Sequence, residues 1–231
     1  MATETKKTVW TPLESNPETM TKLINDIGVT GIRCEDIFGF DADCLAFVPK
    51  PHLGAILCFP DYKKCYNLVK PKYDALKSDN YKPDEKLFFM KQKIGNACGT
   101  FAILHSLANL TNTISVGSGP FAAWLAKAKL LSIEDRSACL EHDKDMAVAH
   151  ESSARSGETD ADVPDVEHHF IALVNVDGTL YEFDGQMDFP RPLGPTTPDT
   201  VLEDVGKLVN EMIAGLDNSI SFNAIALVGD A

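Results

Sequence analysis

The stretch GNACGTFAILHSLANL, residues 95–110, decides the fold, because apolar side chains lie on most sides of the helix that it predicts. A helix that is apolar all round has no face for water, so it must lie in the middle of a fold. Asn96 is placed to cap it, since an asparagine side chain accepts hydrogen bonds from the free N–H groups of a helix start. We therefore predict a buried central helix between Gly95 and Asn112.

Cys98 occupies the second position of this predicted helix. Unpaired N–H groups and the positive end of the helix dipole stabilise a thiolate there, and Gly95 and Gly99 would let a substrate backbone approach closely. Free cysteines more often pack as small hydrophobic residues, as Cys58 is expected to do inside a predicted strand. The position at the helix start leaves both a nucleophilic and a packing interpretation of Cys98 open.

A predicted β-hairpin supplies the partners that a thiolate nucleophile needs. Residues 169–176 and 179–183 flank AspGly at 177–178, which is typical of a two-residue turn. Pairing outward from this turn makes His169 and Asp184 diagonal neighbours on one face, while His168 points the other way. An imidazole held by a carboxylate is the usual base for a cysteine nucleophile. A three-residue turn with a bulge would reverse this parity.

The other polar candidates have structural interpretations. His105 lies about two turns beyond Cys98, roughly 10 Å along the helix axis, and is expected to be a core histidine. Gln92 could donate its side-chain amide to an oxyanion if the chain folds back, but its residue type alone favours the surface. The remaining histidines precede a strand or sit among charges and are expected on the surface: His52, His142 and His150.

Local patterns elsewhere predict further helices and strands. Asn16 and Pro17 open an amphipathic helix that ends near Gly28. Residues 53–59 form a short apolar run, as expected for a strand buried on both faces. Between residues 150 and 162 only two side chains are apolar, which predicts a long exposed loop. The remaining predicted elements are helices at 121–130, 133–140 and 201–213 and a last strand at 220–228.

Length and composition favour one globular domain. The 231 residues, 44% of them hydrophobic, mix helices and strands without a βαβ rhythm, which predicts a single α+β domain over residues 1–231. Six scattered cysteines lack metal-ligand spacing, so we expect reduced thiols, no metal and no cofactor. The formal charge of −13 argues against nucleic acid and favours a basic partner. Without an apolar run of signal or membrane-span length, we expect a soluble cytoplasmic monomer, not bound to a membrane.

Four long motifs lie in order along the chain: PLESNP at 12–17, KQKIGNACGT at 91–100, HFIALVNVDGTLYEFDG at 169–185 and FNAIAL at 222–227. They resemble the corresponding motifs of the ubiquitin C-terminal hydrolase family, specifically of its short members that consist of the catalytic domain alone. The resemblance spans almost the whole chain.

This resemblance implies a fold and a set of roles. Cys98 would be the nucleophile, His169 the base, Asp184 its orienting group and Gln92 the oxyanion-hole amide, which replaces the surface interpretation of Gln92. The implied fold is a papain-like α+β cysteine protease domain with a central antiparallel sheet flanked by helices and a knotted backbone. The implied activity releases small adducts and peptides from the C-terminal glycine of ubiquitin through a Cys98 thioester. A Nedd-type modifier is a further candidate substrate.

The resemblance also implies a ubiquitin-binding surface. Residues 150–162 correspond to the active-site crossover loop of the family, beneath which the ubiquitin tail is threaded. Glu14 and Asp36 are acidic positions that would meet the basic tail. The candidate contact residues are Pro12, Leu13, Glu14, Ser15, Asn16, Pro17, Asp36, Ser153, Ala154, Arg155, Ser156, Gly157, Glu158, Thr159, Asp160, Ser219, Ile220, Ser221, Phe222, Asn223 and Ala224.

Some features depart from the family, and the same residues also fit other functions. Gln186 stands where members often have arginine, and the crossover loop is about two residues shorter than in close relatives. We expect no C-terminal extension, because the chain ends at Ala231. The alternatives are another Cys-His-Asp amidase or acyltransferase and a ubiquitin-binding module without activity. A helical interaction protein gives no reason for the four catalytic candidates to coincide.

Overall fold

A central antiparallel sheet organises the protein. The computed structural model describes residues 8–60, 62–159, 167–216 and 222–230. Within these ranges six strands pair in the order β1-β6-β2-β3-β4-β5, and every pair is antiparallel. The strands are β1 (Ile32–Asp36), β2 (His52–Phe59), β3 (His169–Val176), β4 (Thr179–Phe183), β5 (Arg191–Pro195) and β6 (Asn223–Gly229).

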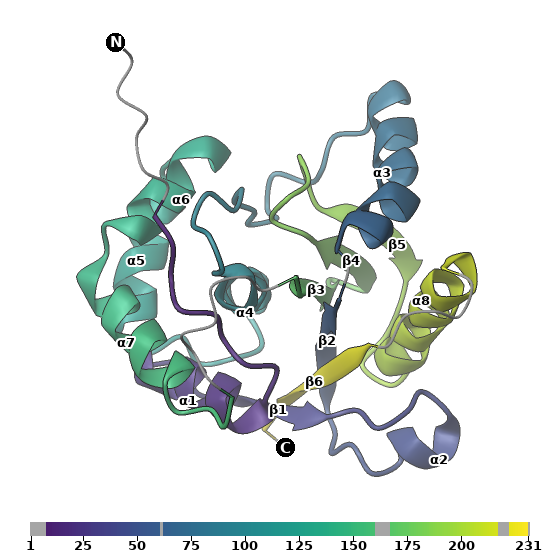
Figure 1. The fold of residues 1–231 in the computed structure, drawn as a ribbon, viewed down its shortest axis with the longest axis horizontal. Coiled ribbons are helices and arrows are strands. Elements are labelled where there is room, and N and C mark those ends of the chain that lie inside the picture. Colours follow the sequence, from purple (N-terminus) through teal and green to yellow (C-terminus); the bar gives the residue numbers. More distant parts are fainter. Residues whose placement is uncertain (1–7, 61, 160–166, 217–221, 231) are drawn as a thin grey trace.

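Helices cover both faces of this sheet. The helix α4 lies against one face with α1, α5, α6 and α7 outside it, while α3 and α8 lie on the other side (Figure 1). The helices are α1 (Pro17–Asp26), α2 (Ala42–Leu45), α3 (Tyr62–Ser78), α4 (Cys98–Asn109), α5 (Pro120–Ala128), α6 (Ile133–Glu141), α7 (Lys144–Ala154) and α8 (Val201–Gly215). None of the described helices is both long enough and apolar enough to cross a membrane.

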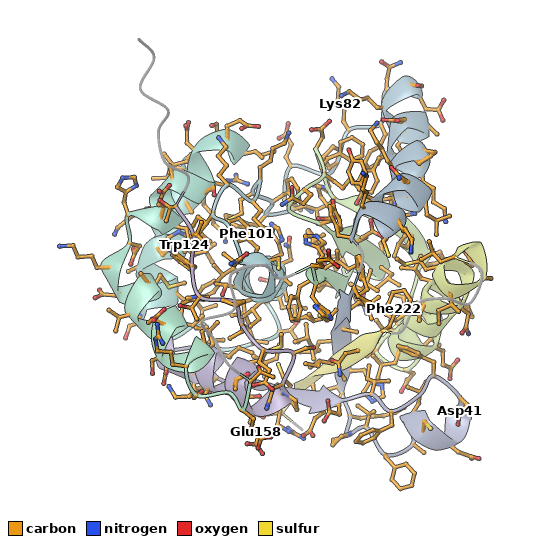
Figure 2. All side chains as sticks on the ribbon, viewed as in Figure 1. Asp41, Lys82, Phe101, Trp124, Glu158 and Phe222 are labelled. Atoms are coloured by element: carbon orange, nitrogen blue, oxygen red, sulfur yellow. The ribbon has the colours of Figure 1, made fainter. Side chains whose placement is uncertain are left out.

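The alternation of side chains along the strands separates two cores. All of β2 is buried, as predicted for a strand covered on both faces, with Cys58 on the α4 side and Phe59 on the α8 side. Figure 2 shows Phe101 and Trp124 in the layer beside α4, whereas Phe222 lies toward α8. The predicted α+β class is confirmed.

Several local predictions are also confirmed. Asn16 accepts hydrogen bonds from the first N–H groups of α1, and Pro17 is its first residue. The turn at 177–178 sets Val176 opposite Thr179, which is the hairpin register derived from the sequence.

The central helix is buried as predicted but begins differently. Every residue of α4 from Cys98 to Ala108 is buried. Ala97, rather than Asn96, is the N-cap residue, and Asn96 instead has a positive φ of 57°. Because alanine has no side-chain acceptor, no side-chain cap engages the first N–H groups of α4.

The predicted exposed loop at 150–162 is wrong over residues 150–154, because α7 continues to Ala154. His150, predicted on the surface, is buried, with Nδ1 2.7 Å from Thr100 Oγ1 and Nε2 2.8 Å from Thr11 O. Ser153 is also buried. Small and polar side chains thus form a buried helix face that hydropathy does not reveal, and residues 160–162 lie outside the described ranges.

The remaining histidine predictions are mixed. His52, also predicted on the surface, is buried, and its Nε2 lies 3.1 Å from Val48 O. His142 is exposed and His105 is fully buried, as predicted.

Close packing at the centre of the sheet gives a test of the fold. A Cβ atom at Gly54 of β2 would lie 2.3 Å from Leu173 O of β3. Gly54→Ala should lower the free energy of unfolding by about 2–4 kcal/mol, since the strands must separate to admit the methyl group. In the control Gly95→Ala, the new methyl group meets the exposed side chain of Val9, which can rotate, and stability should change little. Equal urea denaturation curves for the two variants would contradict this account of the sheet.

Candidate active site

The sequence-predicted catalytic residues meet at one end of the sheet. Cys98 begins α4, His169 begins β3, and Asp184 follows the last residue of β4. Because β3 and β4 are antiparallel, the start of one strand lies beside the end of the other. A cleft of about 470 Å³ opens here and is lined by Cys98, His169 and Gln92, among others.

His169 and Asp184 form a buried pair. The distance from His169 Nε2 to Asp184 Oδ1 is 2.8 Å, and the side chains are only 7% and 5% exposed. The Gln186 N–H also donates to Asp184 Oδ1, at 2.9 Å. His168 is exposed, and its side chain takes no part in this pair, although its backbone oxygen lies 4.0 Å from Cys98 Sγ. The geometry therefore favours His169 over His168, as the hairpin register predicted.

The electrostatics of the pair favour a protonated imidazole. Burial disfavours the charged form, but the Asp184 carboxylate, together with the sulfur of Cys98 in its thiolate form, outweighs it and raises the pKa of His169 to about 10. Since Asp184 engages Nε2, Nδ1 is the ring nitrogen that remains for Cys98.

Aromatic side chains enclose this pair. Tyr62 lies over His169, with 4.1 Å between ring centroids, and its hydroxyl donates to Asp184 Oδ2 at 3.4 Å. Burial and the charge of Asp184 raise the pKa of Tyr62, so the phenol stays a donor. No sequence pattern predicted a helix over residues 62–78, so Tyr62 was not expected at the site. The available signal was the spacing of Tyr62, Tyr66 and Tyr73, interrupted by Pro71.

Gln92 is half-buried and faces the same cleft as Cys98. Its side-chain Nε2 donates to Ile94 O at 3.1 Å, and its backbone N–H donates to Gly185 O at 2.8 Å. The side-chain Oε1 is buried and has no hydrogen-bond partner among the described residues. An amide nitrogen carries two hydrogens, so Nε2 retains one donor for a negative oxygen in the cleft.

The predicted crossover loop contacts the segment at 12–17, which reaches this cleft. Pro12 and Leu13 line it, as does Glu167 on the far side of residues 160–166. On the near side, the Glu158 N–H donates to the Glu14 carboxylate at 2.8 Å. Figure 2 shows Glu158 at the edge of the molecule beside α1.

Four of the predicted ubiquitin contacts have buried side chains, namely Leu13, Ser153, Ala154 and Ala224, and Leu13 also lines the cleft. The predicted contacts Asp160, Ser219, Ile220 and Ser221 lie outside the described ranges. All of the contact residues stay predictions.

This arrangement is suited to acyl transfer. It combines a thiol at a helix start, a protonated imidazole, a carboxylate and an amide donor around one cleft. In the part of the chain that the structure describes, no three His, Cys, Asp or Glu side chains are placed to hold a metal ion.

Comparisons with known proteins point in one direction. The family model described as "Ubiquitin carboxyl-terminal hydrolase, family 1" matches residues 10–214. The chain is 40% identical over 220 residues to a ubiquitin carboxyl-terminal hydrolase of Drosophila melanogaster, covering 94% of this chain and 96% of that one. A relative from Aplysia californica is 42% identical over 209 residues, covering 89% and 95%. The UCH37 catalytic domain of Trichinella spiralis, solved with ubiquitin vinyl methyl ester, gives a TM-score of 0.73 at 26% identity and covers 96% of both chains.

The His169–Asp184 pair should make stability depend on pH. Because folding raises the pKa of His169 to about 10, its contribution is complete below the unfolded-state pKa of about 6.5 and is lost as pH rises between these values. Between about pH 6.5 and about pH 9.5, the native chain should lose at least about 1 kcal/mol more unfolding free energy than Asp184→Asn, whose neutral amide cannot sustain that pKa. Urea denaturation measures both, and equal losses would contradict the pairing.

Proposed function

The chain belongs to the ubiquitin carboxyl-terminal hydrolase family 1, whose members are cysteine peptidases, and from this premise we propose that Cys98 attacks the bond after the C-terminal glycine of ubiquitin. In this proposal His169 is the base, Asp184 orients it and Gln92 supports the oxyanion. The observation that supports the assignment most directly is the buried His169–Asp184 pair, with 2.8 Å between Nε2 and Oδ1, in the cleft that Cys98 lines.

The first step is attack by the Cys98 thiolate on the carbonyl carbon of the terminal glycine. The imidazolium of His169 balances the thiolate charge, and Asp184 holds the ring so that Nδ1 faces the sulfur. As the tetrahedral intermediate forms, its oxyanion accepts hydrogen bonds from the Cys98 N–H and the Gln92 amide. These donors act only once the charge develops, so they lower the barrier rather than tighten substrate binding.

The intermediate then collapses and releases the leaving group. His169 gives its proton to the departing amine, and a thioester between ubiquitin and Cys98 remains. Water, deprotonated by the now neutral His169, attacks the thioester, which releases ubiquitin with a free C-terminal carboxylate and restores the Cys98 thiolate beside the His169 imidazolium. The enclosing ring of Tyr62 keeps bulk water from the His169–Asp184 pair during both halves of the reaction.

The shape and charge of the protein suit a ubiquitin tail as substrate. The cleft is lined by Pro12 and Leu13 of the N-terminal segment and by Glu167 and His168 just before β3, so an extended tail can lie in it while the ubiquitin body rests outside. The formal charge of −13 complements a basic tail. A Nedd-type modifier with a similar tail is a further candidate substrate.

The proposal also covers the compartment, the oligomeric state and the domain organisation of the protein. All six cysteines lie in the described ranges and none of them forms a disulfide, which suits a reducing compartment such as the cytoplasm. The protein would act there as a monomeric, single catalytic domain, with residues 155–162 as the remaining part of the predicted crossover loop.

Substitution of the two neighbouring histidines tests the assignment. Cys98→Ala should abolish hydrolysis of a fluorogenic ubiquitin C-terminal amide while ubiquitin still binds. His169→Ala should lower kcat at least about 10³-fold, because the Cys98 thiolate loses its positively charged partner and the leaving amine loses its proton donor. His168→Ala is the matched control and should retain most activity, since its side chain is exposed. An inactive His168→Ala with an active His169→Ala would overturn the assignment.

Loop length should set the size of leaving group that is released. An insertion of about ten Gly/Ser residues after Ala161 would widen the loop at small closure cost and would keep the Glu158–Glu14 contact. Cleavage of a folded ubiquitin fusion should accelerate, with little change for small adducts. The same insertion after Asn80, in the turn that follows α3, is the control and should change neither rate. If the insertion after Ala161 does not speed cleavage of the folded fusion, the loop does not limit the size of the leaving group.

A further inference from the structure

The chain before Cys98 contains an irregular stretch, residues 88–93, here called the Gln92 segment. It forms neither helix nor strand. Phe88, Phe89 and Met90 are nonetheless buried, so their backbone groups need hydrogen-bond partners inside the protein. Side chains of two helices supply those partners.

Two of these side chains come from the last turns of α4. Asn109 Oδ1 accepts from the Phe88 N–H at 2.8 Å, and Asn109 Nδ2 donates to Phe88 O at 2.9 Å. One turn earlier, His105 Nε2 lies 3.2 Å from both the nitrogen and the oxygen of the Met90 backbone. The His105 ring also stacks on Phe89 with 5.1 Å between centroids. Side chains of α4 therefore bond to the backbone groups of alternate residues of the segment, Phe88 and Met90.

Contacts from elsewhere complete the attachment. Arg136 of α6 donates to Phe89 O at 2.6 Å, and Ser137 accepts from the Lys93 N–H at 3.2 Å. At the far end, the Gln92 N–H donates to Gly185 O, next to Asp184. A Cβ at Gly185 would lie 2.9 Å from Gln92 Cβ, so the segment passes close to the residue beside the catalytic carboxylate.

The spacing of these contacts along α4 matches the spacing of the contacted residues along the Gln92 segment. Two residues of chain can span up to about 6.6 Å, and one helical turn of four residues spans about 6 Å. The step from Phe88 to Met90 therefore matches the step from Asn109 back to His105. Continuing this register carries Gln92 toward the first turn of α4, where Cys98 lies, and both residues line the same cleft.

We propose that His105 and Asn109 are positioning residues for the reaction, because they fix the Gln92 amide relative to Cys98 through the backbone of the Gln92 segment. Neither touches the substrate. Burial lowers the pKa of His105 to about 4, so its ring is neutral near pH 7 and can bond the Met90 backbone without carrying a charge into the core. The proposal rests on the oxyanion role proposed above for Gln92.

A double-mutant cycle tests this role. His105→Phe keeps a ring between Phe89 and Phe183 but removes the hydrogen bond to Met90. It should lower kcat about 10-fold with KM nearly unchanged, and His105→Gln, which restores an amide, should recover part of the loss. Gln92→Ala alone should lower kcat about 10²-fold. In the Gln92→Ala background, His105→Phe should cost less than about 2-fold, because the amide that it positions is gone.

Two further measurements separate positioning from a general structural role. Alkylation of Cys98 by iodoacetamide forms no oxyanion, so its rate should be the same in His105→Phe and the native chain. Ser106→Ala is the matched control, because it removes a buried hydroxyl of α4 that donates to Ala102 O, within α4 itself, and kcat should stay unchanged. If His105→Phe does not fold, Asn109→Asp takes its place in the cycle; it loses the donor to Phe88 O and His105 O and keeps an acceptor for the Phe88 N–H.

The outcomes are distinct. An equal fall in kcat in both backgrounds, or slower alkylation of Cys98, would overturn the positioning role and leave the proposed function standing. If Gln92→Ala keeps full kcat, the oxyanion role of Gln92 fails and the positioning proposal fails with it.

Discussion

Burial of α4 is the constraint on which the rest of the structure depends. A helix without a polar face must be covered on every side, and here the sheet covers one side while α1, α5, α6 and α7 cover the other (Figure 1). Such a helix cannot shift without disturbing both layers. Its first residue, Cys98, is therefore fixed relative to His169 on the neighbouring strand, and its last turns fix the segment that carries Gln92.

Placing a charged pair at the rim of this core has an electrostatic consequence. Burial alone would leave His169 neutral, and the ring is protonated because Asp184 and Cys98 are close enough to outweigh that penalty. Tyr62 lies over His169 and donates to Asp184 Oδ2, so both oxygens of the carboxylate have hydrogen-bond partners within the protein. The same low-dielectric surroundings strengthen each interaction that the developing oxyanion makes.

Sequence patterns predicted the parts of this site that depend on local rules. The turn at 177–178 fixes one pairing register, which selects His169. Sequence patterns failed where contacts between distant residues determine the structure. His150 is buried in α7 because hydrogen bonds to residues far away in sequence satisfy its ring. Pro71 interrupts the helical pattern of α3, the helix that brings Tyr62 to the site. Gln92 came from family resemblance alone. Its segment has no regular structure, and the side chains that hold it lie far away in sequence.

Covalent trapping by ubiquitin tests the central claim most directly. Ubiquitin carrying an electrophilic C terminus, such as the vinyl methyl ester, should form one adduct with the native chain, and peptide mapping by mass spectrometry should place it on Cys98. His169→Ala should slow its formation strongly, because the thiolate loses its charged partner. An adduct on another of the six cysteines, or none with the folded native chain, would contradict the account.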